Sequence, residues 1–486
     1  MLTTKQLQQV HSGYAEYVYR WDYYMRSYMG AEEYRDGAYL RKYIGEEQSP
    51  GDQYAQRLLD TALHNHAKVV VDTYRSFIFR NPPTRTMSTL VDNEFAMSFV
   101  KDSNLDGMNM TQFMREVNDT VSIYGNAWIG TDRPAYTVDT AAQEAELSIR
   151  AYAMLYDPTC VLDWSYGKQP NGAQTLNYIK VVEGQFEDYD CIKIWTPETI
   201  EEYIVTKKHI NTDSNMLTMG NANYQRDAVV ASYGKITAHT VYDNPLGYVP
   251  FQCVMDTKSF HRGIGTSDIG DVCDIQRTMY NKLSELYSNI RLSSHPSIVA
   301  EPSAEINGGA GAIIYVDEQT QIQPYLLQPT GASIDGIISA IQLDVEAIDA
   351  STHLKAVKAK SGSPMSGVAM QTEKALLNAK LSDRANMLQR AEQKLWKDWF
   401  NWQGILPPDE FEVHYEKSFD LRDKHSDLEL YRKAIETVPH DSFVHYLHDQ
   451  IAKMLVEDEE DLQQIVESIA EDHKGKGIFV PGMEDE

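Results

Sequence analysis

Residues 266–294 read TSDIGDVCDIQRTMYNKLSELYSNIRLSS, and the rest of the chain is organised around them. Apolar side chains recur every three or four positions, which predicts a helix with one apolar stripe; the stripe consists of Ile269, Val272, Ile275, Met279, Leu283, Leu286 and Ile290. Side-chain oxygens of Thr266, Ser267 and Asp268 can accept the first free N–H groups, so we expect the helix to begin there. It should end at Ser293-Ser294-His295-Pro296, because the residue before a proline disfavours helical backbone. Such a rod is about 40 Å long.

Two further long helices are expected after the first. The second begins behind the cap Ser333, and its apolar face comprises Ile334, Ile337, Ile338, Ile341, Val345 and Ile348. The third runs from near Thr372 to Trp402, and Gly404 is placed to end it. A small β-rich segment separates the first two helices. Helices this long with so narrow an apolar stripe need a core or the same helices of identical neighbouring subunits to pack against.

Composition limits the class of protein. The chain has 486 residues, a formal net charge of −27 and a pI near 4.9, which fits two to four domains or one elongated subunit. Strong acidity argues against coating nucleic acid, although nucleic acid could still pass without sticking. No apolar run is long enough to span a membrane and none resembles a signal peptide, so no membrane partner is expected. Four cysteines stand singly, which favours reduced thiols over a zinc or redox site.

The remaining segments predict a chain of the α+β class. Helices are expected from Thr4 in a Tyr-rich stretch, over Gly51–Phe79 and over Asn109–Tyr124. Short β segments follow between Leu147 and Phe251, and Asp213–Asp227 is expected to be an exposed loop. Beyond Gly404 the pattern predicts a strand and then helices, at residues 411–415, 427–437, 441–455 and 459–473.

No sequence motif for catalysis is found. Gly263-Ile264-Gly265 lacks the third glycine and the βαβ pattern of a dinucleotide site, so a turn before the helix is the simpler interpretation. His64 and His66 are two residues apart on an expected helix and point in different directions, which argues against a shared metal. We therefore expect no metal and no cofactor. A soluble acidic enzyme with an unrecognised active site remains the alternative.

The segment Lys355–Met370, KAVKAKSGSPMSGVAM, is unusual in an acidic chain because it clusters Lys355, Lys358 and Lys360. Its glycines and Pro364 predict a break between two helices. In a monomer this would be a solvated connection. In a ring the lysines would repeat around the axis and could contact phosphates without reading base sequence.

Several segments in order resemble the portal proteins of tailed bacteriophages. The resemblance is spread over most of the chain as loose elements; they are Asn65 to Pro83, Tyr124 to Trp128, Tyr152 to Trp164, Asn244 to Pro250, and Ser267 to Val272 followed by Tyr280-Asn281-Lys282 and Pro296. The Asp213–Asp227 insertion and the Tyr-rich start have no counterpart in the family pattern.

The resemblance implies a ring, typically a dodecamer, at one vertex of the phage head, with no catalysis of its own. It implies these parts of the subunit: a wing at 1–262 together with 372–415, a stem helix at 263–294, a β-rich clip at 295–331, a second stem helix at 332–353, a tunnel loop at 354–371, a long wing-crossing helix at 372–403, and a helical crown with the C-terminal tail at 416–486. A different head–tail connector is the nearest alternative, but such proteins are typically much shorter.

The resemblance also implies partners and candidate site residues. The partners would be other copies of the chain, the terminase large subunit, scaffold and major capsid proteins, a head-completion or tail adaptor protein, and double-stranded DNA passing through the channel. The protein would be part of the virion and assemble in the host cytoplasm. Tunnel-loop candidates facing DNA are Lys355, Lys358, Lys360, Ser363 and Met365; acidic channel candidates are Asp271, Asp274 and Glu285; clip candidates for docking are Glu301, Glu305, Asp317 and Glu318.

Overall fold

A computed structural model describes most of the chain. The described residues are 1–44, 46, 53–134, 149–207, 233–294, 297–300, 313–315, 325–327, 331–358, 367–408, 410–419, 424–437, 443–444, 446–448 and 451–452. They divide into two compact units, Met1–Phe419 and Asp420–Glu486, and each is described by itself. Helices and mostly antiparallel sheets make up the larger unit, so the α+β class is confirmed.

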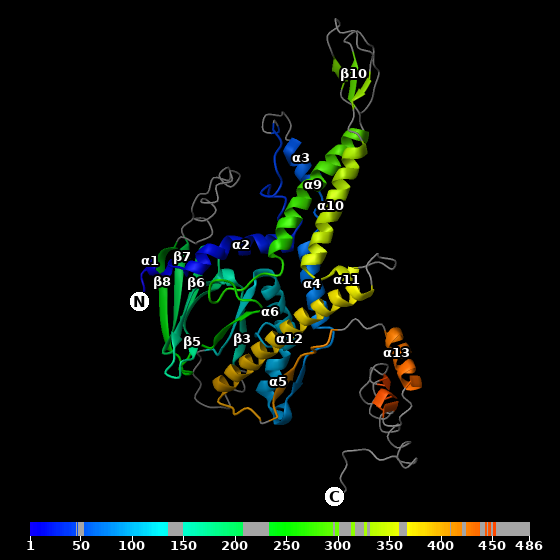
Figure 1. Ribbon diagram of the computed structural model, residues 1–486. Helices are drawn as coiled ribbons and strands as arrows, with labels where there is room; N and C mark the ends of the chain where they lie inside the picture. Colours follow the sequence, from blue (N-terminus) through cyan, green and yellow to red (C-terminus); the bar gives the residue numbers. More distant parts are fainter. Residues whose placement is uncertain are drawn as a thin grey trace. The chain divides into compact units, whose positions relative to one another are not determined.

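The first two long helices form an antiparallel hairpin. They are α9 (Gly270–Ser294) and α10 (Gly331–Ser351), drawn side by side in green and yellow in Figure 1. Lys282 of α9 bonds Asp344 of α10, with Nζ 2.8 Å from Oδ2. Of the predicted α9 stripe, Ile269, Val272, Met279, Leu283 and Leu286 are buried, Ile275 is half-buried and Ile290 is exposed; Ile338 of the predicted α10 stripe is also exposed.

The start of α9 differs from the prediction while its end agrees with it. The helix begins at Gly270, not at Thr266, because the residues before it have other partners. The Thr266 N–H donates to the Thr257 carbonyl, and the Asp268 carboxylate accepts from Arg384. The helix ends at Ser294, directly before the segment His295-Pro296 that predicted the stop.

A small sheet lies between the two helices in sequence. It consists of β10 (Ser297–Ala300), β11 (Ile313–Tyr315) and β12 (Tyr325–Leu327), with β10 in the centre. Strand β10 pairs in parallel with β11 and antiparallel with β12. The predicted β-rich segment between the helices is therefore present.

The third long helix, α12, spans Gly367–Gln403 and begins about five residues earlier than predicted. A glycine at the first position of a helix avoids the penalty that it has in the interior, so Gly367 does not prevent this start. A short helix, α11 (Lys355–Lys358), lies within the same expected loop. Gly404 adopts φ +64°, a left-handed conformation that ends α12 as predicted.

Helix α12 lies in the centre of the main core. Trp396 and Trp399 are completely buried, and both pack on Phe99, with ring centroids 4.9 and 5.3 Å apart. Phe99 belongs to α5 (Glu94–Lys101), which sequence analysis did not predict. The core also includes α6 (Met110–Tyr124), whose N-cap Asn109 and left-handed Gly125 agree with the predicted bounds.

The N-terminal helices are α1 (Thr4–Leu7), α2 (Ser12–Met29), α3 (Gln53–Asp60) and α4 (His66–Ile78). One continuous helix over Gly51–Phe79 was predicted, and this is wrong. Asn65 interrupts it, because its side chain accepts from the Lys68 N–H as an N-cap and donates to the Tyr28 carbonyl. The break between α3 and α4 is therefore held against the C-terminal end of α2, where Tyr28 lies.

In the described residues the remaining strands form three more sheets. A three-stranded sheet has the order β3-β2-β9, and a five-stranded antiparallel sheet has the order β4-β5-β6-β7-β8. A pair, β1-β13, joins the segment before α5 to the segment after α12. The strands are β1 (Thr84–Thr86), β2 (Asn126–Asp132), β3 (Tyr152–Tyr156), β4 (Val161–Lys168), β5 (Gln174–Gln185), β6 (Tyr189–Trp195), β7 (Thr199–Lys207), β8 (Tyr233–Asp243), β9 (Phe251–Met255) and β13 (Glu412–His414). Two short 3-10 helices are η2 (Ser88–Asp92) and η3 (Pro158–Cys160).

The second unit contains α13 (Lys424–Thr437), near the predicted 427–437. The expected helix at 459–473 and the expected loop Asp213–Asp227 lie outside the described residues, and the helix expected at 441–455 is described only in part. In the described part of the chain, no helix is both long and apolar enough to cross a membrane.

Candidate functional site

Three acidic residues selected from the sequence share one face of α9. At 100° per residue, Asp271, Asp274 and Glu285 fall within an arc of about 60°. All three are exposed. Asp274 accepts hydrogen bonds from the Tyr23 hydroxyl at 3.3 Å and from Arg277 at 3.2 Å. The three carboxylates therefore lie together on one face of α9, and their orientation toward a channel stays a prediction.

The acidic face lies between two elements packed on α9. On one side is α10, held by Lys282 and Asp344. On the other side is the segment after α2, where Asn281 accepts from the Arg41 N–H and donates to the Tyr39 carbonyl, both at 2.9 Å. These contacts fix the rotation of α9 about its own axis, so the acidic face has a defined direction.

Of the tunnel-loop candidates, only Lys355 has a described side chain. It is exposed at the first position of α11. The backbone of Lys358 ends that helix, and Lys360, Ser363 and Met365 lie outside the described residues. The clip candidates Glu301, Glu305, Asp317 and Glu318 also lie outside them. Their proposed roles stay predictions.

A buried ionic cluster at the base of α9 was missed by sequence analysis. Arg384 of α12 donates to Asp268 at 2.6 Å and to Asp256 at 3.3 Å, and Lys380 lies 3.1 Å from Asp268. Burial alone would raise the pKa of Asp268, but Arg384 and Lys380 outweigh it and keep that pKa below its ordinary value. Lys380 and Arg384 are four residues apart on a predicted helix, so they share one face. This spacing was the signal in the sequence that could have found the cluster. The cluster fixes α12 to the entry of α9.

A groove of about 810 Å³ borders this cluster. Its walls come from β9, the segment that leads into the first turn of α9, the last residue of α10 and one face of α12; they include Gln252, Met255, Asp271, Ser351, Asp383 and Arg390. Most of the lining is polar. Its charged residues Asp256, Asp268 and Lys380 are already engaged in the ion pairs of the cluster. The groove carries no recognisable catalytic arrangement.

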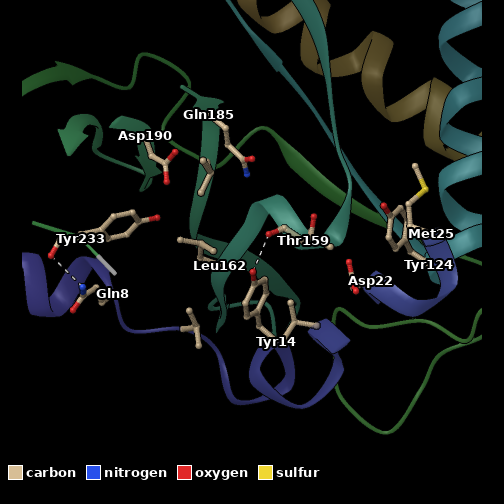
Figure 2. A pocket seen from close by; sticks show the side chains of 13 residues that line it. Gln8, Tyr14, Asp22, Met25, Tyr124, Thr159, Leu162, Gln185, Asp190 and Tyr233 are labelled. Atoms are coloured by element: carbon tan, nitrogen blue, oxygen red, sulfur yellow. Dashed lines mark hydrogen bonds between the residues drawn. The ribbon is translucent and has the colours of Figure 1, made fainter. Parts of the chain in front are cut away.

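A second cavity, of about 260 Å³, lies beside α2 (Figure 2). Tyr14, Val18, Asp22 and Met25 line it from α2; Gln8, Val10, Tyr124, Thr159, Leu162, Val182, Gln185, Asp190 and Tyr233 complete it. The Tyr14 hydroxyl donates to the Thr159 carbonyl at 3.0 Å. Burial raises the pKa values of Tyr14, Tyr124 and Tyr233, so their hydroxyls stay neutral. Among the described residues neither lysine nor arginine lines the cavity, but Arg26 pairs with Asp22 and Lys207 with Asp190, both at 3.0 Å.

One group of metal-ligating side chains lies close together in the described residues. Ligand atoms of Glu183, Cys191 and Glu202 are all within 4.8 Å of one another. Burial, with Glu202, raises the pKa of the Cys191 thiol to about 12, which opposes the thiolate that zinc requires. Lys193 lies 3.4 Å from Glu183 and competes for that carboxylate. We assign no metal here.

Comparisons with known proteins give a likeness to solved structures but no family. No family model and no curated protein matches the chain. Among solved structures, it is similar to a chain in the neck of an empty GTA particle computed with C6 symmetry, at 10% identity and a TM-score of 0.37. The match covers 82% of this chain and 91% of that chain. A TM-score this low does not define a common fold, so the function is argued from the chain itself.

Proposed function

We propose that the chain is the portal subunit of a tailed bacteriophage. It assembles into a ring at one capsid vertex, through which double-stranded DNA is packaged and later ejected, and it catalyses no reaction itself. The observation that carries this proposal is the α9–α10 hairpin with the small β10–β12 sheet inserted between its helices. Two long antiparallel helices joined through a β module correspond to the stem and clip that the family resemblance implies.

The outer surfaces of the hairpin support assembly with identical copies. Ile290 and Leu292 of α9, and Ile338 and Leu343 of α10, are exposed apolar side chains. Leu343 leaves 66% of its surface in water. Apolar side chains gathered on one exposed element mark interaction sites in soluble proteins. In a ring, the hairpins of the neighbouring subunits would cover them.

The remaining parts are assigned on the same basis. The unit up to β9 and the long α12 would form the wing, with α12 spanning about 55 Å from its length of 37 residues. The segment between α10 and α12, including Lys355, would be the tunnel loop. The residues of the second unit would form the crown.

The excess of acidic residues would have a physical role in such a ring. Carboxylates along the channel would repel the DNA duplex and keep it from adhering to the wall. This repulsion decays over a Debye length of about 8 Å at physiological salt. Asp271, Asp274 and Glu285 are placed to supply it if the exposed face of α9 lines the channel.

The partners follow from this role. The clip would bind the terminase large subunit during packaging and a head-completion or tail adaptor protein afterwards. Scaffold and major capsid proteins would surround the ring, which would assemble in the host cytoplasm and remain in the virion.

The test is the assembly state of the purified protein. Negative-stain electron microscopy should show rings with a central hole, and mass photometry should give a mass near twelve subunits of 55.3 kDa. A compact monomer or dimer at micromolar concentration, unchanged by adding a scaffold protein, would overturn the proposal.

A further inference from the structure

A small basic patch lies on the N-terminal segment that packs against α9. It consists of Arg41 and Lys42, both exposed, and of Ile44, which is fully exposed. The nearby carboxylate of Glu46 is already paired with Arg57 at 2.8 Å, and in the part of the chain that the structure describes neither Arg41 nor Lys42 forms an ion pair. The chain has a formal net charge of −27, so its copies repel one another, and an unpaired positive patch is a place where two copies can attract.

Backbone contacts of Arg41 hold this patch on α9. The Arg41 N–H donates to Asn281 Oδ1 at 2.9 Å, and the Arg41 carbonyl accepts a hydrogen bond from Arg57 of α3. The Lys42 ammonium lies 5.0 Å from the ring centroid of Tyr54, also in α3. The patch therefore has a fixed height along α9, while the Arg41 guanidinium stays available for another partner.

The outer face of α10 carries the opposite charge. Asp344 faces α9, because it accepts a hydrogen bond from Lys282 at 2.8 Å. At 100° per residue, Gln342 and Glu346 each lie about 160° from Asp344, so they point away from α9. Both are exposed, Leu343 between them is exposed as well, and within the described residues Glu346 forms no ion pair. This acidic patch thus combines a free carboxylate with an exposed leucine, as the basic patch combines free cations with an exposed isoleucine.

The two patches lie on opposite sides of α9 at nearly the same height. Figure 1 shows α9 between α3 and α10. The α9 residues that bind them, Ser284 for α3 and Lys282 for α10, are about 160° apart around the helix axis. Asn281, which holds the basic patch, is next to Lys282 in sequence. A rise of 1.5 Å per residue therefore puts Arg41 and Glu346 within about 5 Å of one another in height.

We infer that the basic patch of one copy packs against the acidic patch of the next copy around the ring. The inference rests on the proposed ring. A closed ring needs a head-to-tail contact between two different surfaces, and rotation about the ring axis preserves height. Two patches at one height on opposite sides of the hairpin meet both requirements. Opposite charges favour this pairing over contact between two identical faces, and Ile44 and Leu343 supply its apolar centre.

This contact also gives the acidic face of α9 a direction. The middle of the arc of Asp271, Asp274 and Glu285 lies about 50° from Lys282 and about 110° from Ser284, so the face lies between the two contact sides. Neither neighbouring copy would cover it, as a face that lines a channel requires.

The first test reverses the charges and then restores the pairing. In Arg41→Glu, Lys42→Glu, mass photometry over a dilution series should show that the concentration at which half the protein is in rings rises about tenfold or more, because like charges now meet. Adding Gln342→Lys, Glu346→Lys should bring that concentration back to within about threefold of the wild type, because the two patches attract again with exchanged signs. Circular dichroism checks that each variant is folded.

The matched control is Lys101→Glu, Lys397→Glu, which makes the same change in net charge at exposed positions of α5 and α12. If the patch variant assembles as well as this control, or if the exchanged charges restore nothing, the inference is overturned. A patch variant with normal rings and weakened binding of a DNA duplex would make the patch a DNA contact, which also overturns it. Absence of rings in the wild type would instead contradict the proposed function.

The second test is crosslinking in wild-type rings. A water-soluble carbodiimide joins an amine to a carboxylate only where the two groups are in direct contact. Peptide mass spectrometry should find a Lys42–Glu346 crosslink in rings and not in dissociated subunits, since within one subunit the two residues lie on opposite sides of α9. Lys42→Arg keeps the charge but removes the amine, so its rings should form without this crosslink. Wild-type rings that lack the crosslink would overturn the inference alone.

Discussion

Arg85 and Glu392 form a buried ion pair that joins two distant parts of the chain. Arg85 Nε in β1 lies 2.5 Å from Glu392 Oε1 in α12, and the Glu392 side chain is completely buried. The Tyr415 hydroxyl donates to the other carboxylate oxygen at 2.7 Å, and Trp396 donates to Oε1 at 3.3 Å. One carboxylate thus connects the strand before α5, the centre of α12 and the segment after β13.

Removing one member of this pair should destabilise the larger unit strongly. Arg85→Met leaves the Glu392 carboxylate buried without its cation, and breaking a buried pair in this way costs about 3–5 kcal/mol. Equilibrium denaturation followed by tryptophan fluorescence would measure the loss in unfolding free energy.

The matched control is Arg20→Met. Arg20 pairs with Glu16 at 4.0 Å, and both side chains are about half exposed. Exposed pairs of this kind contribute less than about 1 kcal/mol. If Arg85→Met costs no more than Arg20→Met, the pair does not stabilise the fold.

Lys180 should anchor the N-terminus. Its side chain is 1% exposed, and its ammonium donates to the carbonyls of Leu7 at 3.1 Å and Gln6 at 3.4 Å, and also to that of Gln9. Lys180→Met would leave these carbonyls without a donor. Hydrogen–deuterium exchange of residues 1–9 should then accelerate at least tenfold while that of α12 is unchanged. If residues 1–9 exchange as slowly in Lys180→Met as in the wild type, Lys180 does not anchor the N-terminus.

His11 should make stability depend on pH. Its Nδ1 accepts the Gly13 N–H at 3.0 Å as the N-cap of α2, and its ring stacks on Trp164 at 4.0 Å. Burial lowers the pKa of His11, nearby Asp163 raises it in part, and His261 lowers it further. The unfolded chain therefore binds more protons at mildly acidic pH, so stability should fall as the pH drops below about 6.5 toward the lowered folded pKa.

The control for this pH effect is His11→Asn, which can still cap the helix but does not titrate. Unfolding free energies of both proteins at pH 7.5, 6.5, 5.5 and 4.5 would show the difference. The wild type should lose more stability than the variant over this range. Identical pH slopes would mean that His11 contributes nothing to it.

Local periodicity was enough to predict the long helices. In α9, α10, α12 and α6, apolar spacing and nearby proline, glycine or asparagine residues placed one or both ends to within a few residues. The signals agree because each helix has one buried stripe and polar residues elsewhere. The sequence also supplied Asp271, Asp274 and Glu285 as channel candidates, but it did not predict that they share one face of α9.

Tertiary contacts account for what the sequence did not predict. Asp268 looks like a helix cap in sequence, but Arg384 and Lys380, more than one hundred residues later, use its carboxylate. Asn65 interrupts an apolar stripe that continues through it, because its side chain also reaches Tyr28. Strand β9 was not predicted because its apolar pattern is too short to stand out, and the α2 cavity is assembled from segments far apart in the chain.

The lysines of the proposed tunnel loop should contact DNA without holding the ring together. Lys355 is exposed, and nothing in its described surroundings requires its charge for packing. Replacing Lys355, Lys358 and Lys360 with Ala should leave ring mass unchanged, impair DNA movement or retention, and reduce the salt dependence of duplex binding, since fewer counterions are released. Loss of the ring by mass photometry would make the segment a structural joint instead.

Neutralising the acidic face of α9 should have the opposite effect on DNA. The triple variant Asp271→Asn, Asp274→Asn, Glu285→Gln removes three negative charges per subunit from exposed positions, so folding and ring mass should not change. If this face lines the channel, weaker repulsion lets the duplex approach the wall, and duplex binding at physiological salt should strengthen several-fold while packaging slows.

Net charge alone could produce a similar trend, so the comparison requires an equally neutralised protein. Asp60→Asn, Glu187→Gln, Asp243→Asn removes three exposed charges from other elements. Because screening confines repulsion to about 8 Å, charges outside the channel should have little effect on DNA inside it. Equal behaviour of the two triple variants, or unchanged packaging in the first, would show that the exposed face of α9 does not line the channel.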